Sequence, residues 1–83
     1  MKILLYVNTS QNLDNSNFLG GIEILNYELA NFLKKKHNTI LSNTLSKKLL
    51  SISWDIVISS NDSRIFNQVK TKRKILWLHN KLQ

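Results

Sequence analysis

The sequence predicts an α/β domain built on a small, open, parallel sheet of about four strands with flanking helices. Short unbroken apolar runs bounded by polar residues are typical of strands that are buried on both faces. Between these runs, apolar residues recur with helical spacing. Because strands and helices alternate along the chain, the strands are expected to be parallel and joined by right-handed crossovers.

The first strand and the first helix have the clearest patterns. Residues 3–7 are continuously apolar, and a polar loop at 8–17 follows them. Helical spacing then predicts a helix over about 21–36, with glutamates early and lysines at its end, as the helix dipole favours. The residues expected on its buried face are Ile22, Leu25, Leu29, Phe32 and Leu33.

Three further strands are predicted from short apolar runs. They lie at 39–42, 54–59 and 74–78. Trp54 opens one of these strands and Trp77 lies inside another, so both rings are expected to pack in the core rather than stack on bases.

The segments between these strands are more polar. Residues 44–52 allow a short helix. Asn61 or Asp62 is a candidate cap for another helix after the third strand, and the basic run 70–74 is interpreted as a connection. The inward positions of that helix are expected to be Ile65, Phe66 and Val69.

Composition limits the classes of function. The 83 residues include no cysteine, which excludes disulfides and thiolate metal sites, and no apolar run approaches the ~20 residues of a membrane span. Neither histidine has carboxylates at metal spacing, so no metal site and no cofactor are expected. The net charge of +7 favours contact with anionic partners, although the lysines are spread along the chain.

Candidate ligand-binding residues gather where the predicted strands end. Parallel sheets bind ligands beyond the carboxyl ends of their strands. Gly20 and Gly21 precede the first helix, where backbone N–H groups can meet a phosphate; a plain turn is the alternative. Glu23 is either a sugar ligand or a residue that matches the helix dipole. The remaining candidates at this edge are Asn61 after the third strand and His79 and Asn80 after the fourth, with His79 a possible acid, base or donor.

Residues 20–33, Gly-Gly-Ile-Glu-Ile-Leu-Asn-Tyr-Glu-Leu-Ala-Asn-Phe-Leu, resemble the Gly-Gly-x-Glu helix of retaining GT-B glycosyltransferases. Residues 54–60 resemble that family's Asp-hydrophobic strand, and residues 75–80 its next strand, which ends in His and then Asp or Asn. The resemblance implies a truncated, Rossmann-like N-terminal domain over residues 1–83. It also implies that Gly20 and Gly21 lie against a donor diphosphate or the acceptor, and His79 near the transferred sugar.

The implied function is therefore transfer of a sugar from a nucleotide-sugar donor to a sugar or lipid-linked acceptor. The family's C-terminal domain, which carries most donor contacts, is absent from the 83 residues, so the isolated chain is expected to be inactive. The region before Trp54 is also shorter than is usual in the family. The expected location is the cytoplasm, with an anionic inner membrane surface as a possible peripheral partner.

Two other functions stay open on the sequence. One is a small basic module that binds nucleic acid or an anionic surface without catalysis, although no nucleic-acid recognition motif is present. The other is an α/β domain that is completed by another chain. Clustering of the lysines on one face would favour the first, and concentration-dependent association would favour the second.

Overall fold

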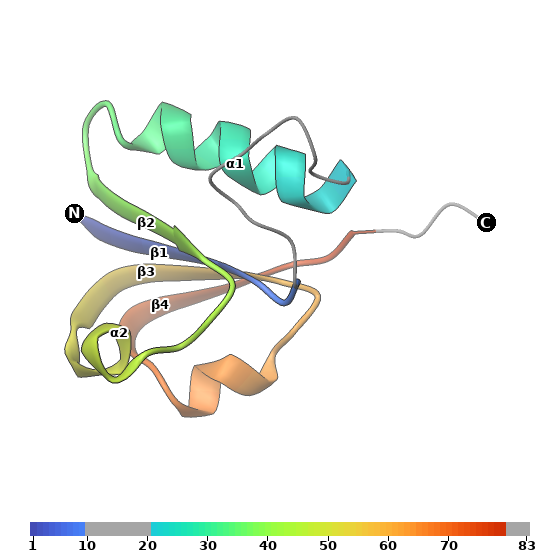
Figure 1. Cartoon of the computed structure of the whole chain (residues 1–83). Coiled ribbons are helices and arrows are strands. Elements are labelled where there is room, and N and C mark those ends of the chain that lie inside the picture. The colour runs from blue at the N-terminus through green and yellow to red at the C-terminus, as the bar shows by residue number, and fades with distance from the viewer. Residues whose placement is uncertain (10–20, 80–83) are drawn as a thin grey trace.

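A computed structural model describes residues 1–9 and 21–79 of the chain. Strands and helices alternate along it (Figure 1). The elements are β1 (Lys2–Val7), α1 (Gly21–Leu33), β2 (Asn38–Ser42), α2 (Lys47–Ser51), β3 (Ser53–Ser60), the 3-10 turn η2 (Arg64–Asn67) and β4 (Lys70–Trp77).

The four strands form one open sheet in the order β2-β1-β3-β4, and every neighbouring pair is parallel. The chain thus moves from β1 to one side for β2 and then crosses to the other side for β3. α1 covers one face of the sheet, whereas α2 and η2 lie on the opposite face (Figure 1). This is a small Rossmann-like α/β domain, and the predicted fold class is confirmed.

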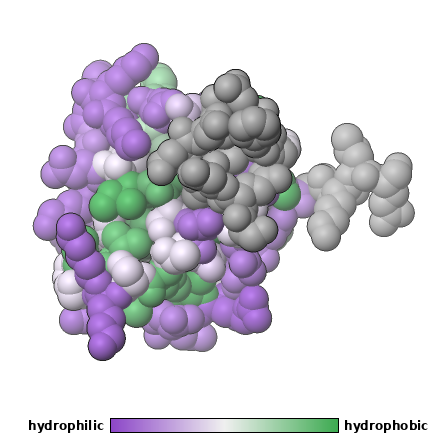
Figure 2. All heavy atoms as spheres, in the orientation of Figure 1, coloured by the Kyte–Doolittle hydropathy of each residue, from purple (hydrophilic) through white to green (hydrophobic). Residues whose placement is uncertain are grey.

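The core consists of two apolar layers, one on each face of the sheet, because alternate residues of a strand point to opposite faces. Leu4 and Val57 belong to the layer under α2 and η2, together with Leu49, Trp54, Ile65 and Val69. Ile3, Leu5 and Ala30 form the layer under α1. On the side of the molecule seen in Figure 2, an apolar area is bordered on the left by hydrophilic side chains.

Trp54 is buried, as predicted, and its Nε1–H donates to the carbonyl oxygen of Leu49 at 3.0 Å. This bond fastens the end of α2 to the start of β3. Trp77 is only half-buried, and its ring lies 4.4 Å from that of His79. Its expected place in the core is therefore wrong: it packs at the end of the edge strand β4.

The predicted helix over 21–36 is real but ends earlier, at Leu33, and a hydrogen-bonded turn follows. Its predicted buried face is also partly wrong. Leu25 and Phe32 are 45% and 66% exposed, whereas Asn26 and Ala30 are the buried residues of the helix. The inward stripe is rotated because Asn26 finds hydrogen-bond partners inside the domain.

Two predictions about the second half of the chain are corrected. The segment after Asp62 forms a 3-10 turn rather than an α-helix, although Ile65 and Val69 are buried as expected. Residues 70–74 are not a connection, because β4 begins at Lys70 and pairs with β3 from Ser53 onward.

None of the helices within residues 1–9 and 21–79 has the length and apolar character that a membrane crossing needs.

Candidate functional site

The candidate site is a pocket of about 530 Å³ at the carboxyl ends of β1 and β3. These two strands are neighbours, and the chain leaves them toward opposite sides of the sheet. Such a switch in strand order leaves a crevice in which open α/β sheets bind their ligands. The lining residues come from three segments. They are Val7 and Asn8 at the end of β1, Ile22 and Glu23 in α1, and Ser60, Asn61, Asp62, Ser63 and Arg64 from the end of β3 to the start of η2.

α1 begins beside this pocket at Gly21. Gly21 does not have a positive φ, and a Cβ built on it would meet no atom within 4 Å. Neither its backbone conformation nor crowding by the described residues therefore requires glycine here. Glu23 lines the pocket from the first turn, where helix N–H groups lack intrahelical partners. Gly20 lies outside the described residues.

Asn26 connects α1 to the end of β3. Its Nδ2 donates to the carbonyl oxygen of Ile22 at 3.0 Å and to Oγ of Ser60 at 2.8 Å. Asn26 is fully buried, and its Oδ1 has no hydrogen-bond partner among residues 1–9 and 21–79. A buried acceptor without a partner costs about 1–3 kcal/mol, so this amide is not placed there for stability alone.

His79 joins the same cluster from the end of β4. Its Nε2 lies 3.1 Å from Oγ of Ser60, which makes Ser60 a bridge between Asn26 and His79. The imidazole also packs against Trp77, with their ring planes 40° apart. His79 does not line the pocket itself and reaches it through Ser60, which does.

Asn61 shapes the turn between these elements. It is the only described non-glycine residue with a positive φ, 56°, a conformation that asparagine tolerates better than most residues. Its backbone N–H donates to the carbonyl oxygen of Trp77, and its Oδ1 accepts from the N–H of His79 at 2.8 Å. Asn61 therefore ties β3 to the end of β4 as well as lining the pocket.

Asp62 and Arg64 supply the charges at the pocket's outer side. The guanidinium Nε of Arg64 lies 3.2 Å from Oδ1 of Asp62, which also accepts from the backbone N–H of Arg64. These hydrogen bonds hold the pKa of the Asp62 carboxyl below its usual value and raise the pKa of Arg64. The Arg64 side chain is 81% exposed, so it remains reachable by an anionic ligand.

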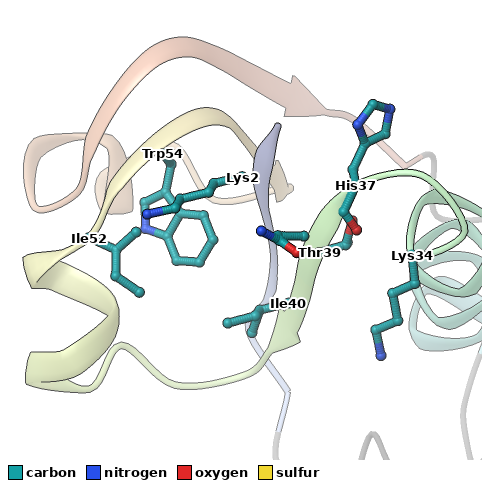
Figure 3. A pocket seen from close by; sticks show the side chains of 8 residues that line it. Lys2, Lys34, His37, Thr39, Ile40, Ile52 and Trp54 are labelled. Atoms are coloured by element: carbon teal, nitrogen blue, oxygen red, sulfur yellow. The ribbon is translucent and has the colours of Figure 1, made fainter.

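A second pocket, of about 450 Å³, lies at the opposite, amino-terminal edge of the sheet. In Figure 3, Trp54 and Ile52 face Ile40 across it, whereas Lys34 and His37 lie apart on the side of α1. Its polar groups therefore do not converge on one point. Nor do residues 1–9 and 21–79 contain a group of three or more histidine or acidic side chains that could hold a metal ion.

The structure brings four of the predicted site residues to one edge. Gly21, Glu23, Asn61 and His79 lie around the ends of β1, β3 and β4, whereas Asn80, like Gly20, lies outside the described residues. The sequence reasoning missed Asn26. The available signal was its place four residues after Ile22 and four before Ala30, which puts a polar residue on the inward stripe.

No protein-family model matches this chain, and comparisons with curated proteins and with solved structures also find no match. The Rossmann-like fold is identified from the parallel sheet and its strand order. Because Rossmann-like folds host many unrelated activities, a function has to be argued from the site.

Proposed function

We propose that the chain forms the acceptor-side, Rossmann-like domain of a GT-B-type glycosyltransferase, which transfers a sugar from a nucleotide-sugar donor to a sugar or lipid-linked acceptor. The observation that carries this proposal is the meeting of the α1 start, the β3 end and His79 at one sheet edge. The resemblance of residues 20–33 and of residues 75–80 to that family supports the same reading.

Gly21 is the strongest support for a ligand at the helix start. Among the described residues neither φ nor crowding requires glycine at this position, and a residue without a Cβ allows a ligand to approach the backbone closely. The N–H groups of the first turn and the positive end of the helix dipole would stabilise the charge of a diphosphate there. The diglycine loop thus supplies binding rather than proton transfer.

His79 and Glu23 are the polar groups proposed for the sugar. His79, held by Ser60 and packed on Trp77, would donate or accept a hydrogen bond at the transferred sugar or the acceptor. Glu23 would accept from sugar hydroxyls at the mouth of the pocket. Turnover would need a second, nucleotide-binding domain, because in the family that residues 20–33 and 75–80 resemble the C-terminal domain carries most donor contacts.

A titration followed by amide NMR tests this function. The labelled chain would be titrated with UDP-glucose, UDP-N-acetylglucosamine and GDP-mannose. We expect one of them to shift the amides of Gly21, Glu23, Asn61 and His79, and to leave those of Lys36 and Asn38 at the opposite edge unchanged. Shifts confined to the opposite edge, or none with any of the three, would contradict the proposal.

The alternative is a basic module that binds an anionic surface without catalysis. One observation favours it: the first half of β4 presents exposed cations at Lys70, Lys72, Arg73 and Lys74. Co-sedimentation with phosphatidylglycerol vesicles at low and high salt would test it. If K70E/K74E abolishes binding and the exposed-site control K47E does not, the alternative is supported; if nucleotide-sugar shifts persist in K70E/K74E, the two functions are separable.

A further inference from the structure

The hydrogen bonds around Asn26 fix the direction in which its amide points. A carbonyl oxygen can only accept, so the Asn26 atom 3.0 Å from the Ile22 oxygen has to be the donor Nδ2. The same Nδ2 lies 2.8 Å from Oγ of Ser60. Asn26 therefore donates to Ser60, and the Ser60 oxygen is already an acceptor on that side.

This leaves the hydroxyl proton of Ser60 with one described acceptor. Nε2 of His79 lies 3.1 Å from Oγ, and Ser60 is only 5% exposed, so water does not readily replace this partner. If Nε2 carried the proton instead, it would donate to Oγ, and the hydroxyl proton would point at no described acceptor. The arrangement that satisfies both the Asn26 amide donor and the Ser60 hydroxyl donor runs from Asn26 to Ser60 to His79.

We infer that Asn26 and Ser60 are positioning residues that hold His79 as the neutral Nδ1–H tautomer, so that the site offers a nitrogen donor to an acceptor oxygen of the ligand. The tautomer of a histidine is set by the bond that its other nitrogen makes. Nδ1 of His79 has no hydrogen bond to any described residue, and Trp77 packs against the ring. The ligand part of this inference rests on the proposed function; the tautomer does not.

Oδ1 of Asn26, which has no hydrogen-bond partner in the described part of the chain, is an independent observation in favour of such a role. An asparagine at a fully buried helix position leaves one polar atom unpaired, whereas an apolar residue would leave none. The amide is therefore kept for what Nδ2 does at Ser60. Oxygen acceptors of two kinds fit the Nδ1–H donor: a phosphate oxygen and a sugar oxygen.

Long-range nitrogen–proton NMR of the histidine rings tests the inference on the unliganded 83-residue chain. At a pH of about 8.5, where histidine side chains are neutral, we expect Nδ1 of His79 to carry the proton. Ser60→Ala should shift the ring toward the Nε2–H form that dominates in free histidine, and Ser60→Thr, which keeps the hydroxyl, should restore Nδ1–H. His37, at the opposite edge, is the internal control and should not change.

An Nε2–H ring in the wild-type chain, or an unchanged Nδ1–H ring in Ser60→Ala, would overturn the inference. The wild-type spectrum decides even if a variant fails to fold. Inorganic pyrophosphate and methyl glucoside are then added separately. The additive that moves the Nδ1 resonance of His79 shows whether the acceptor oxygen belongs to a phosphate or to a sugar. If a nucleotide sugar binds but no additive moves that resonance, the ligand assignment fails; if none binds, the proposed function fails and the tautomer result stands.

Discussion

The side-chain Oδ1 of Asn61 accepts a hydrogen bond from the backbone N–H of His79 at 2.8 Å. The N–H of Asn61 in turn donates to the carbonyl oxygen of Trp77 at 3.0 Å. Asn61 is therefore hydrogen-bonded both to the last residue of β4 and to the residue two positions beyond it. This pair sets where the imidazole stands relative to the carboxyl end of β3.

Variants of Asn61 separate its backbone conformation from its side-chain bond. We expect Asn61→Ala to lower the free energy of unfolding by about 1–3 kcal/mol, because alanine is strained at a φ of 56° and the bond to His79 is lost. Asn61→Gly removes the strain and should cost about 1 kcal/mol. Urea unfolding measures both, and equal losses in the two variants would show that the conformation carries no strain.

Trp54→Phe tests the attachment of α2. The change removes the Nε1–H donor to Leu49 and shrinks a ring that is almost fully buried. We expect a loss of about 1–3 kcal/mol from the missing hydrogen bond and the cavity together. Leu45→Ala, at a partly buried position packed against the same cluster, is the comparison and should cost less. A neutral Trp54→Phe would mean that the indole bond contributes nothing net.

Acid should weaken the fold in part through Asp62. Arg64 lowers the pKa of this carboxyl in the folded chain, so the stabilisation is complete above its ordinary value of 3.8 and is lost as the pH falls through the lower folded value. Asp55, whose pKa is lowered by a hydrogen bond from the backbone of Lys2, acts in the same direction. Asp62→Asn should therefore flatten, but not abolish, the fall in unfolding free energy between about pH 5 and pH 2. An unchanged slope would show that Asp62 does not contribute to the loss of stability in acid.

Asn26→Asp should give the opposite dependence on pH. A carboxylate at this fully buried position would face the Ile22 carbonyl oxygen and have its pKa raised. A rise of about 2–3 units costs about 3–4 kcal/mol at pH 7, at 1.36 kcal/mol per unit. The penalty should be absent below the ordinary carboxyl pKa and grow as the pH rises through the folded value. A variant as stable as wild type at pH 7 would show that water reaches the side chain at this position.

The fold was predictable because its strands correspond to local patterns in the sequence. The apolar runs at 3–7 and 54–59 need no distant contact to be recognised, and both became central strands of the sheet. The start of β4 was not predictable in the same way. Its cations at 70–74 lie on an exposed edge strand. A lysine-rich edge strand cannot be distinguished from a connecting segment by its sequence pattern.

The site was only partly predictable for a different reason. Gly21, Glu23, Asn61 and His79 follow from the rule that parallel strands end at one edge. The role of Asn26 does not follow from that rule. Helical spacing places it on the inward stripe, but its partner Ser60 is 34 residues away in the sequence. Hydrogen bonds between distant side chains, which rotate the buried face of α1, are invisible to a local pattern.

Gly21→Ala tests the central claim, that a ligand rather than the fold requires glycine at the start of α1. Apart from its chain neighbours and the backbone of its own helix, no atom of the described residues lies within 4 Å of the added Cβ. The variant should therefore fold and be as stable as wild type or slightly more stable. We expect the dissociation constant for the nucleotide sugar that wild type binds to rise about tenfold or more, a loss of about 1.4 kcal/mol. Unchanged affinity in a folded Gly21→Ala chain would contradict the claim.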